Sequence, residues 1–269
     1  MSGQDSDPPL PRRRPLQTWA LAAAVVLGLA AMVPPLLTEA RRYQFAAALQ
    51  LALLAIVVPG LATVGAPWTR VRLAGGSGVR PGPADRLAEG RLRHRELIRS
   101  VGFIALDLAA VLAWMTPAAV GAVTRHAWLV PVETVCLVVL GIGMWLELVE
   151  STPLVPRSGL LRRAVLAAVV LWAFWTAAYV IGLSRSAWYA NFHHAAGHGL
   201  SAAADQQVAV ALLWLVAAVM LVPVVFWNAL RWIRDEENPD VELYRLTRIE
   251  RLTTPRSTPR SDGDVGSGP

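Results

Sequence analysis

Histidine is the residue type whose placement in this chain points most directly to a chemistry. Neutral imidazole is a ligand for copper and zinc, and four of the five histidines fall in two loops between apolar runs. His194 and His198 would share one face if their loop is helical, since residues four apart are neighbours on a helix. The sequence allows a metal site here, with copper as the candidate ion, and it equally allows an exposed polar loop without metal. The four residues are His126, His193, His194 and His198.

Other metal-binding side chains are few. Met115 has a thioether that could bind cuprous copper, although methionine in an apolar helix more often serves packing. The single cysteine, Cys136, lies inside an apolar run, so one chain can form neither a disulfide nor a cysteine cluster for zinc.

No motif of a common catalytic site accompanies these residues. The chain has no glycine-rich phosphate loop after a strand, no serine elbow, no paired carboxylates and no Cys/His nucleophile arrangement. We therefore expect a protein that is not an enzyme.

Two carboxylates lie within apolar runs. An ionisable group at that depth costs about 2.5 to 3.5 kcal/mol on membrane-insertion scales, so its presence usually has a reason. Asp107 could line a proton or cation path, make a polar contact between helices, or stay protonated and hydrogen-bonded in a helix bundle; all three remain open. Glu133 has the same alternatives, but it is placed to reach the outer interface.

The elements that must hold these groups are long apolar runs. Hydrophobic residues make up 55% of the chain and charged residues 16%, which is typical of a membrane protein. Each run is long enough to cross about 30 Å of hydrocarbon as a helix, and backbone groups in lipid are satisfied within a helix. The sequence predicts an all-α, multi-pass bundle within residues 16–237. Its six spans are about 17–38, 45–68, 97–119, 128–149, 163–183 and 206–232.

The arginines predict the orientation of this bundle. All 25 basic residues are arginine; 21 lie in segments that alternate spans place on one side, and 4 lie on the other. The positive-inside rule puts the richer side in the cytoplasm, with both termini and the loop 69–96. Residues 1–15 and 238–269 are expected to be largely disordered. Because topology explains the basic residues, the expected partner is the lipid bilayer and not nucleic acid.

A resemblance to a known family begins in the sixth predicted span. Its entry carries Asp205, Gln206 and Gln207, its helix carries Trp214, and its exit carries Trp232 followed by acidic residues. This pattern resembles the last span of the CtaG family, whose members help to assemble bacterial cytochrome c oxidase. By its position, we expect Asp205 to cap the start of this sixth helix.

The second predicted span carries another part of the resemblance, in Gln50, Pro59, Gly65, Ala66 and Pro67. The departures from the family pattern all replace histidines. The family's two histidines in this span correspond to Ala47 and Leu51, its Trp-His-x-Pro segment corresponds to residues 114–117, and its histidine-rich opening of the next span corresponds to residues 129–134.

The resemblance implies a factor in the plasma membrane of a bacterium that matures a haem-copper oxidase, with oxidase subunits or other assembly factors as partners and copper as the delivered ion. Alanine and leucine cannot bind copper. The chain would therefore use the outer histidines and Met115 in their place, or act as a scaffold without a metal. A small cation or metal transporter or channel, with Asp107 and Glu133 along its path and the histidines in an outer vestibule, is the alternative.

Overall fold

The computed structural model describes residues 15–68, 96–151, 154, 158–184, 188–189, 192 and 201–236. Its contacts divide the chain into two units, Met1–Ala229 and Leu230–Pro269. The first unit contains the bundle described below, and the described part of the second is the last seven residues of helix α11. The predictions for His193, His194 and His198, for both terminal segments and for most of the loop 69–96 lie outside the described residues.

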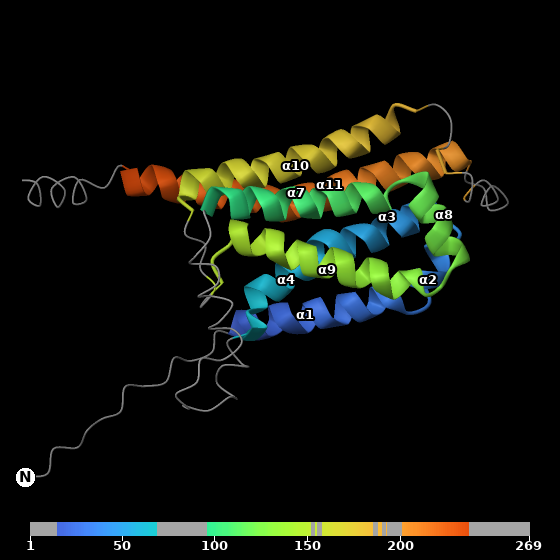
Figure 1. Ribbon diagram of the computed structural model, residues 1–269, viewed down its shortest axis with the longest axis horizontal. Coiled ribbons are helices and arrows are strands. Elements are labelled where there is room, and N and C mark those ends of the chain that lie inside the picture. The colour runs from blue at the N-terminus through green and yellow to red at the C-terminus, as the bar shows by residue number, and fades with distance from the viewer. Residues whose placement is uncertain are drawn as a thin grey trace, which may run out of the picture. The chain divides into compact units, whose positions relative to one another are not determined.

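The described residues form helices, without a strand among them, so the predicted all-α fold is confirmed (Figure 1). One short stretch between α3 and α4, Leu53–Val57, is a turn of π-helix. The α-helices are α1 (Pro15–Met32), α2 (Leu36–Glu39), α3 (Gln44–Ala52), α4 (Val58–Gly65), α7 (Glu96–Trp114), α8 (Pro117–Arg125), α9 (Leu129–Leu148), α10 (Leu160–Gly182) and α11 (Ala202–Glu236).

Five of the expected spans are continuous helical segments, long and apolar enough to cross a membrane. The third predicted span, 97–119, differs from the prediction. Helix α7 ends at Trp114, and α8 leaves it at an angle of 66°. Thr116 stands before a proline, which disfavours helical backbone at that position, and its backbone is extended. Its hydroxyl then accepts a hydrogen bond from the Ala119 N–H at 3.3 Å and caps the new helix.

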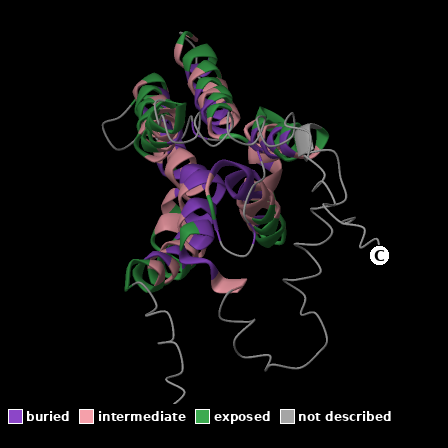
Figure 2. Ribbon diagram, turned by 90° about the vertical axis from the view of Figure 1, so that its left-hand side faces the viewer, coloured by how far each residue is buried: buried purple, intermediate pink, exposed green. Residues whose placement is uncertain are grey.

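The segment Gln44–Gly65 is the centre of the first unit. It contacts α1 on one side and α9 on another. Half of the residues in its apolar stretch (50%) are buried, against 11% for α1, which leaves α1 most of its surface for lipid. Figure 2 shows the same distribution, with buried residues gathered in the central helices and exposed residues on the outer faces.

Close packing of α9 against this central segment depends on Gly141. A Cβ at this position would lie 2.6 Å from Pro59 Cγ and 2.8 Å from the Ala55 carbonyl oxygen. The π-helical turn ends two residues before Pro59, which has no N–H to donate to the Ala55 carbonyl. The indole of Trp145, one turn beyond Gly141, donates to the Ile56 carbonyl at 3.0 Å. A glycine and an indole donor thus accommodate the irregular turn.

Helices α7 and α9 pack side by side and run in opposite directions. Arg99 near the start of α7 pairs with Glu147 near the end of α9. One turn along α7, Phe103 lies 2.7 Å from where a Cβ of Gly143 would be.

Candidate functional site

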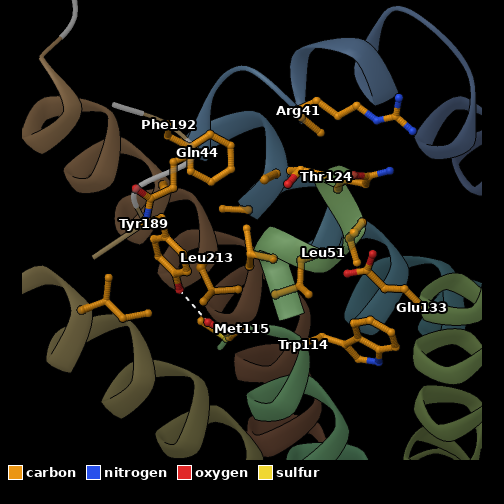
Figure 3. Close-up of a pocket in the computed structure, with 18 of the residues that line it drawn as sticks. Arg41, Gln44, Leu51, Trp114, Met115, Thr124, Glu133, Tyr189, Phe192 and Leu213 are labelled. Atoms are coloured by element: carbon orange, nitrogen blue, oxygen red, sulfur yellow. Dashed lines mark hydrogen bonds between the residues drawn. The ribbon is translucent and has the colours of Figure 1, made fainter. Parts of the chain in front are cut away.

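A cavity of about 90 Å³ lies at the end of the bundle where α2 and α8 are found (Figure 3). We refer to it as the end cavity. Seven helices contribute to its wall, together with Tyr189 and Phe192 between α10 and α11. Its volume is enough for several water molecules. Most of the wall is apolar, and its polar side chains are Arg41, Gln44, Gln50, Thr124, Glu133 and Tyr189.

Positions that the resemblance assigns to histidines meet at this cavity. Ala47 and Leu51 line it from α3, Met115 from the break after α7, and Val130 and Glu133 from the opening of α9. In the sequence, more than 60 residues separate Leu51 from Met115, and the tertiary structure brings the α3 positions to one wall with those from the break after α7 and from α9.

Glu133 is the one acid among the residues that line the end cavity. Figure 3 shows it beside Leu51 and near Trp114, with its carboxylate turned toward the cavity. It makes no hydrogen bond or ion pair with the part of the chain that the structure describes. Glu133 thus lines the cavity, and its reach to the outer membrane interface stays a prediction.

Met115 takes part in the wall through its backbone as well as its side chain. The Tyr189 hydroxyl donates to the Met115 carbonyl at 2.8 Å (Figure 3). Burial raises the pKa of the Tyr189 phenol above its ordinary value of 10.0, so the hydroxyl keeps the proton that it donates. This contact fixes the loop after α10 against the break between α7 and α8.

Two of the proposed metal ligands, His126 and Met115, belong to the part of the chain that the structure describes. His126 is exposed at the end of α8 and is absent from the cavity wall, whereas Met115 belongs to it. Among the described residues, no group of three or more His, Cys, Asp or Glu side chains could hold a metal ion. Copper binding by the remaining three histidines stays a prediction.

The predicted role of Asp205 as the cap of the sixth span, α11, is wrong. Its carboxylate accepts hydrogen bonds from the backbone N–H groups of Gln44 at 2.7 Å and Phe45 at 2.9 Å, at the start of α3. The start of α11 is capped instead by Ser201, whose hydroxyl accepts from the Ala204 N–H at 3.1 Å. Asp205 comes after the cap position and is only 1% exposed, so it points inward to the free donors of another helix.

Three glutamines of the motif also join helix ends around the end cavity. Gln206 donates to the Ile181 carbonyl at 2.9 Å and accepts from the Trp188 N–H at 3.0 Å. Gln207 donates to the Gly182 carbonyl at 2.9 Å, and Gln50 donates to the Ala31 carbonyl at 2.7 Å. The motif residues therefore hold the wall of the cavity in place.

The remaining motif residues of the second span are structural. Pro59 follows the π-helical turn, as described above. A Cβ on Gly65 would lie 2.8 Å from the backbone nitrogen of Leu21, so the glycine allows α4 to approach α1. Ala66, with φ of 44°, ends α4 in the left-handed conformation, and Pro67 follows it.

Asp107 lies elsewhere, on the buried face of α7 with Ser100, Ile104 and Val111. It is 0% exposed, and neither carboxylate oxygen has a hydrogen-bond partner among the residues described. It is absent from the wall of the end cavity. The structure thus brings Glu133 to the cavity but not Asp107.

A buried polar network near the other end of α7 and α9 was missed by the sequence analysis. Glu147 is fully buried, pairs with Arg99 at 3.2 Å and accepts from the Ser100 hydroxyl at 2.8 Å. Close by in the sequence, Glu150 pairs with Arg163 at 2.7 Å. An arginine and an acid at the same predicted end of two neighbouring spans are the signal that could have indicated these pairs.

Comparison with known proteins gives one family. A model of the cytochrome c oxidase caa3 assembly factor family matches residues 7–235, which is most of the chain. Neither the search among curated proteins nor the search among solved structures finds a significant match. The family match covers the second and sixth spans, which carry the resemblance; Gln50 of their motif residues lines the end cavity, and Asp205 hydrogen-bonds the start of α3 beside it. The chain therefore belongs to the cytochrome c oxidase caa3 assembly factor family.

Proposed function

We propose that this protein assists the assembly of a cytochrome c oxidase in the plasma membrane of a bacterium, and that the end cavity is the centre of this activity. One observation carries the proposal. Positions that the resemblance assigns to histidines, on α3, at the break after α7 and at the opening of α9, surround a single cavity that the motif residues Asp205, Gln206 and Gln50 hold together. By the arginine distribution, the cavity opens on the outer side.

The proposed role is that of a scaffold for oxidase subunits. Among the described residues, the wall of the end cavity supplies one thioether, from Met115, and one carboxylate, from Glu133. Cuprous copper prefers soft sulfur and imidazole ligands, so this pair does not fit a copper site by itself. Copper loading would depend on histidines outside the cavity wall.

Deletion of the chain tests the assembly role. The membranes are compared by haem spectrum and oxidase activity, with and without added copper. A scaffold predicts that both signals fall and that copper does not restore them. Full recovery with copper would identify a copper-loading factor instead, and unchanged oxidase would refute the assembly role.

A second test concerns the cavity. Ala47→Phe places a large ring in the wall of the end cavity, whereas Ala109→Phe adds the same ring on the exposed face of α7. Each variant is returned to the deletion strain at matched expression. We expect Ala47→Phe to lose oxidase activity and Ala109→Phe to restore it. Equal restoration by both variants would remove the cavity from the mechanism.

Cation or proton transport is the second candidate function, and the observation that favours it is the buried, unpartnered carboxyl of Asp107. Transport predicts that Asp107→Asn abolishes cation uptake into vesicles and leaves oxidase activity in cells intact. Assembly without transport predicts that vesicles containing the unaltered protein or the Asp107→Asn variant take up no cation.

A further inference from the structure

The entry of α10 contains two polar side chains, Ser158 and Arg162, with buried atoms that have no hydrogen-bond partner in the part of the chain that the structure describes. Ser158 is 4% exposed, and its hydroxyl makes no hydrogen bond with any described residue. Arg162, four residues later, is half-buried, and its Nε and Nη2 atoms are buried without an acceptor. An unpaired guanidinium that is partly removed from water is costly, so this arrangement needs an explanation.

The neighbouring acids Glu147 and Glu150 do not supply an acceptor for Arg162. Glu147 is occupied by Arg99 and Ser100. Glu150 is occupied by Arg163, which follows Arg162 directly. Arg163 is further held by the Ser158 carbonyl, to which its Nε donates at 2.8 Å. Of these two adjacent arginines, one is thus fully engaged within the protein and the other is left with free donors.

The backbone at the same place also offers free donors. Helix α10 begins after Gly159, which has no side chain to cap it, and the first backbone bond of the helix is from the Arg163 N–H to the Gly159 carbonyl at 3.1 Å. The N–H groups in the first turn of α10, before Arg163, have no acceptor within the helix. The helix dipole adds positive potential there. A hydroxyl, a guanidinium and free amides within five residues are a set of donors suited to an anion with several oxygens.

We propose that the segment Ser158–Arg162 binds a phosphate group, either the headgroup phosphate of an anionic lipid or a free phosphate. Arg162 supplies the charge and a planar pair of donors, and Ser158 and the first turn of α10 supply neutral donors. The end of the bundle that carries the site is the one that the arginine distribution assigns to the cytoplasmic face, where lipid phosphates lie at the level of helix ends.

The test uses the full chain in nanodiscs of phosphatidylcholine alone or of phosphatidylcholine with phosphatidylglycerol, and thermal unfolding as the readout. Phosphatidylglycerol should raise the melting temperature of the unaltered protein, and Arg162→Gln should lose that gain. The matched control is Arg234→Gln, which removes an exposed arginine of α11 and should keep it. Inorganic phosphate added to phosphatidylcholine nanodiscs separates the two sources: stabilisation by it identifies a free phosphate site, and stabilisation by the lipid alone identifies a headgroup site.

Titration with phosphatidylglycerol should show about tenfold weaker binding for Arg162→Gln, the effect of losing one charge-assisted contact, and a smaller loss for Ser158→Ala. In phosphatidylcholine alone, Arg162→Gln should be at least as stable as the unaltered protein, because it removes an uncompensated charge. A variant destabilised there, with the phosphatidylglycerol gain retained, would show that Arg162 has a purely structural role. Equal responses of the Arg162 and Arg234 variants, or no stabilisation by either anion, would likewise overturn the proposal.

Discussion

Replacing Asp205 by alanine tests how this protein connects its sixth span to its second. The change removes both acceptors of the Gln44 and Phe45 N–H groups, at 2.7 and 2.9 Å. Gln44 is buried, so its N–H would lack water as well as the carboxylate. Loss of a cap costs about 0.5–2 kcal/mol, and a buried donor left unsatisfied costs about 1–3 kcal/mol. We expect Asp205→Ala to lower the free energy of unfolding by about 3 kcal/mol.

Ser201→Ala is the matched control, because Ser201 is exposed and caps α11 with a single bond. We expect it to cost about 1 kcal/mol, and we expect Asp205→Asn, which keeps one acceptor oxygen, to lie between the two alanine variants. Titration of the protein in detergent micelles with a denaturing detergent measures the free energy of unfolding. Hydrogen exchange of the backbone amides shows which residues are destabilised.

Exchange should rise at residues 44–48 in Asp205→Ala and at residues 202–204 in Ser201→Ala. If Asp205→Ala costs no more than Ser201→Ala, or increases exchange only at the start of α11, the bridging role is refuted. Asp205 would then be the cap of its own helix, as its sequence position suggests.

Three further predictions concern packing, charge and metal. Gly141→Ala should destabilise the bundle by about 1–3 kcal/mol in the same unfolding titration, because its Cβ would overlap Pro59. Gly102→Ala, whose Cβ meets nothing within 4 Å, should be neutral or slightly stabilising, and equal effects would contradict the packing. Glu147→Ala should cost about 3–5 kcal/mol by leaving the buried Arg99 without its partner, and a cost below 1 kcal/mol would contradict this. The purified protein should bind at most one copper ion weakly by calorimetry, and alanine at three positions should remove it; copper retained in full would exclude His193, His194 and His198.

The end cavity is the place where the positions that the resemblance assigns to histidines meet. Ala47, Leu51 and Met115 cannot reproduce three imidazoles, yet they line one cavity with Glu133. The residues that hold its wall, Asp205 and the glutamines of the motif, match the family pattern. This combination of a matching frame and a different cavity wall is the basis of the scaffold role proposed above.

The amino-acid sequence by itself determined the helices. Apolar runs long enough to span the hydrocarbon must satisfy their backbone groups internally, so five continuous helical spans follow from composition and length. The local sequence also specifies the break after Trp114. Thr116 stands before Pro117, which disfavours helical backbone at Thr116, and its side chain caps the next helix. Met115 and Glu133 could be singled out as unusual residue types, but their meeting could not be predicted.

Only the tertiary structure decided which polar groups face each other. Asp205 is 160 residues from its partner Phe45, and Glu147 is 48 from Arg99. Spacing within a helix specifies neighbours three and four residues apart, and it carries no information about the rotation of one helix against another. That rotation is set by close contacts such as Gly141 on Pro59, and it places Glu133 in the wall of the end cavity and Asp107 in the core.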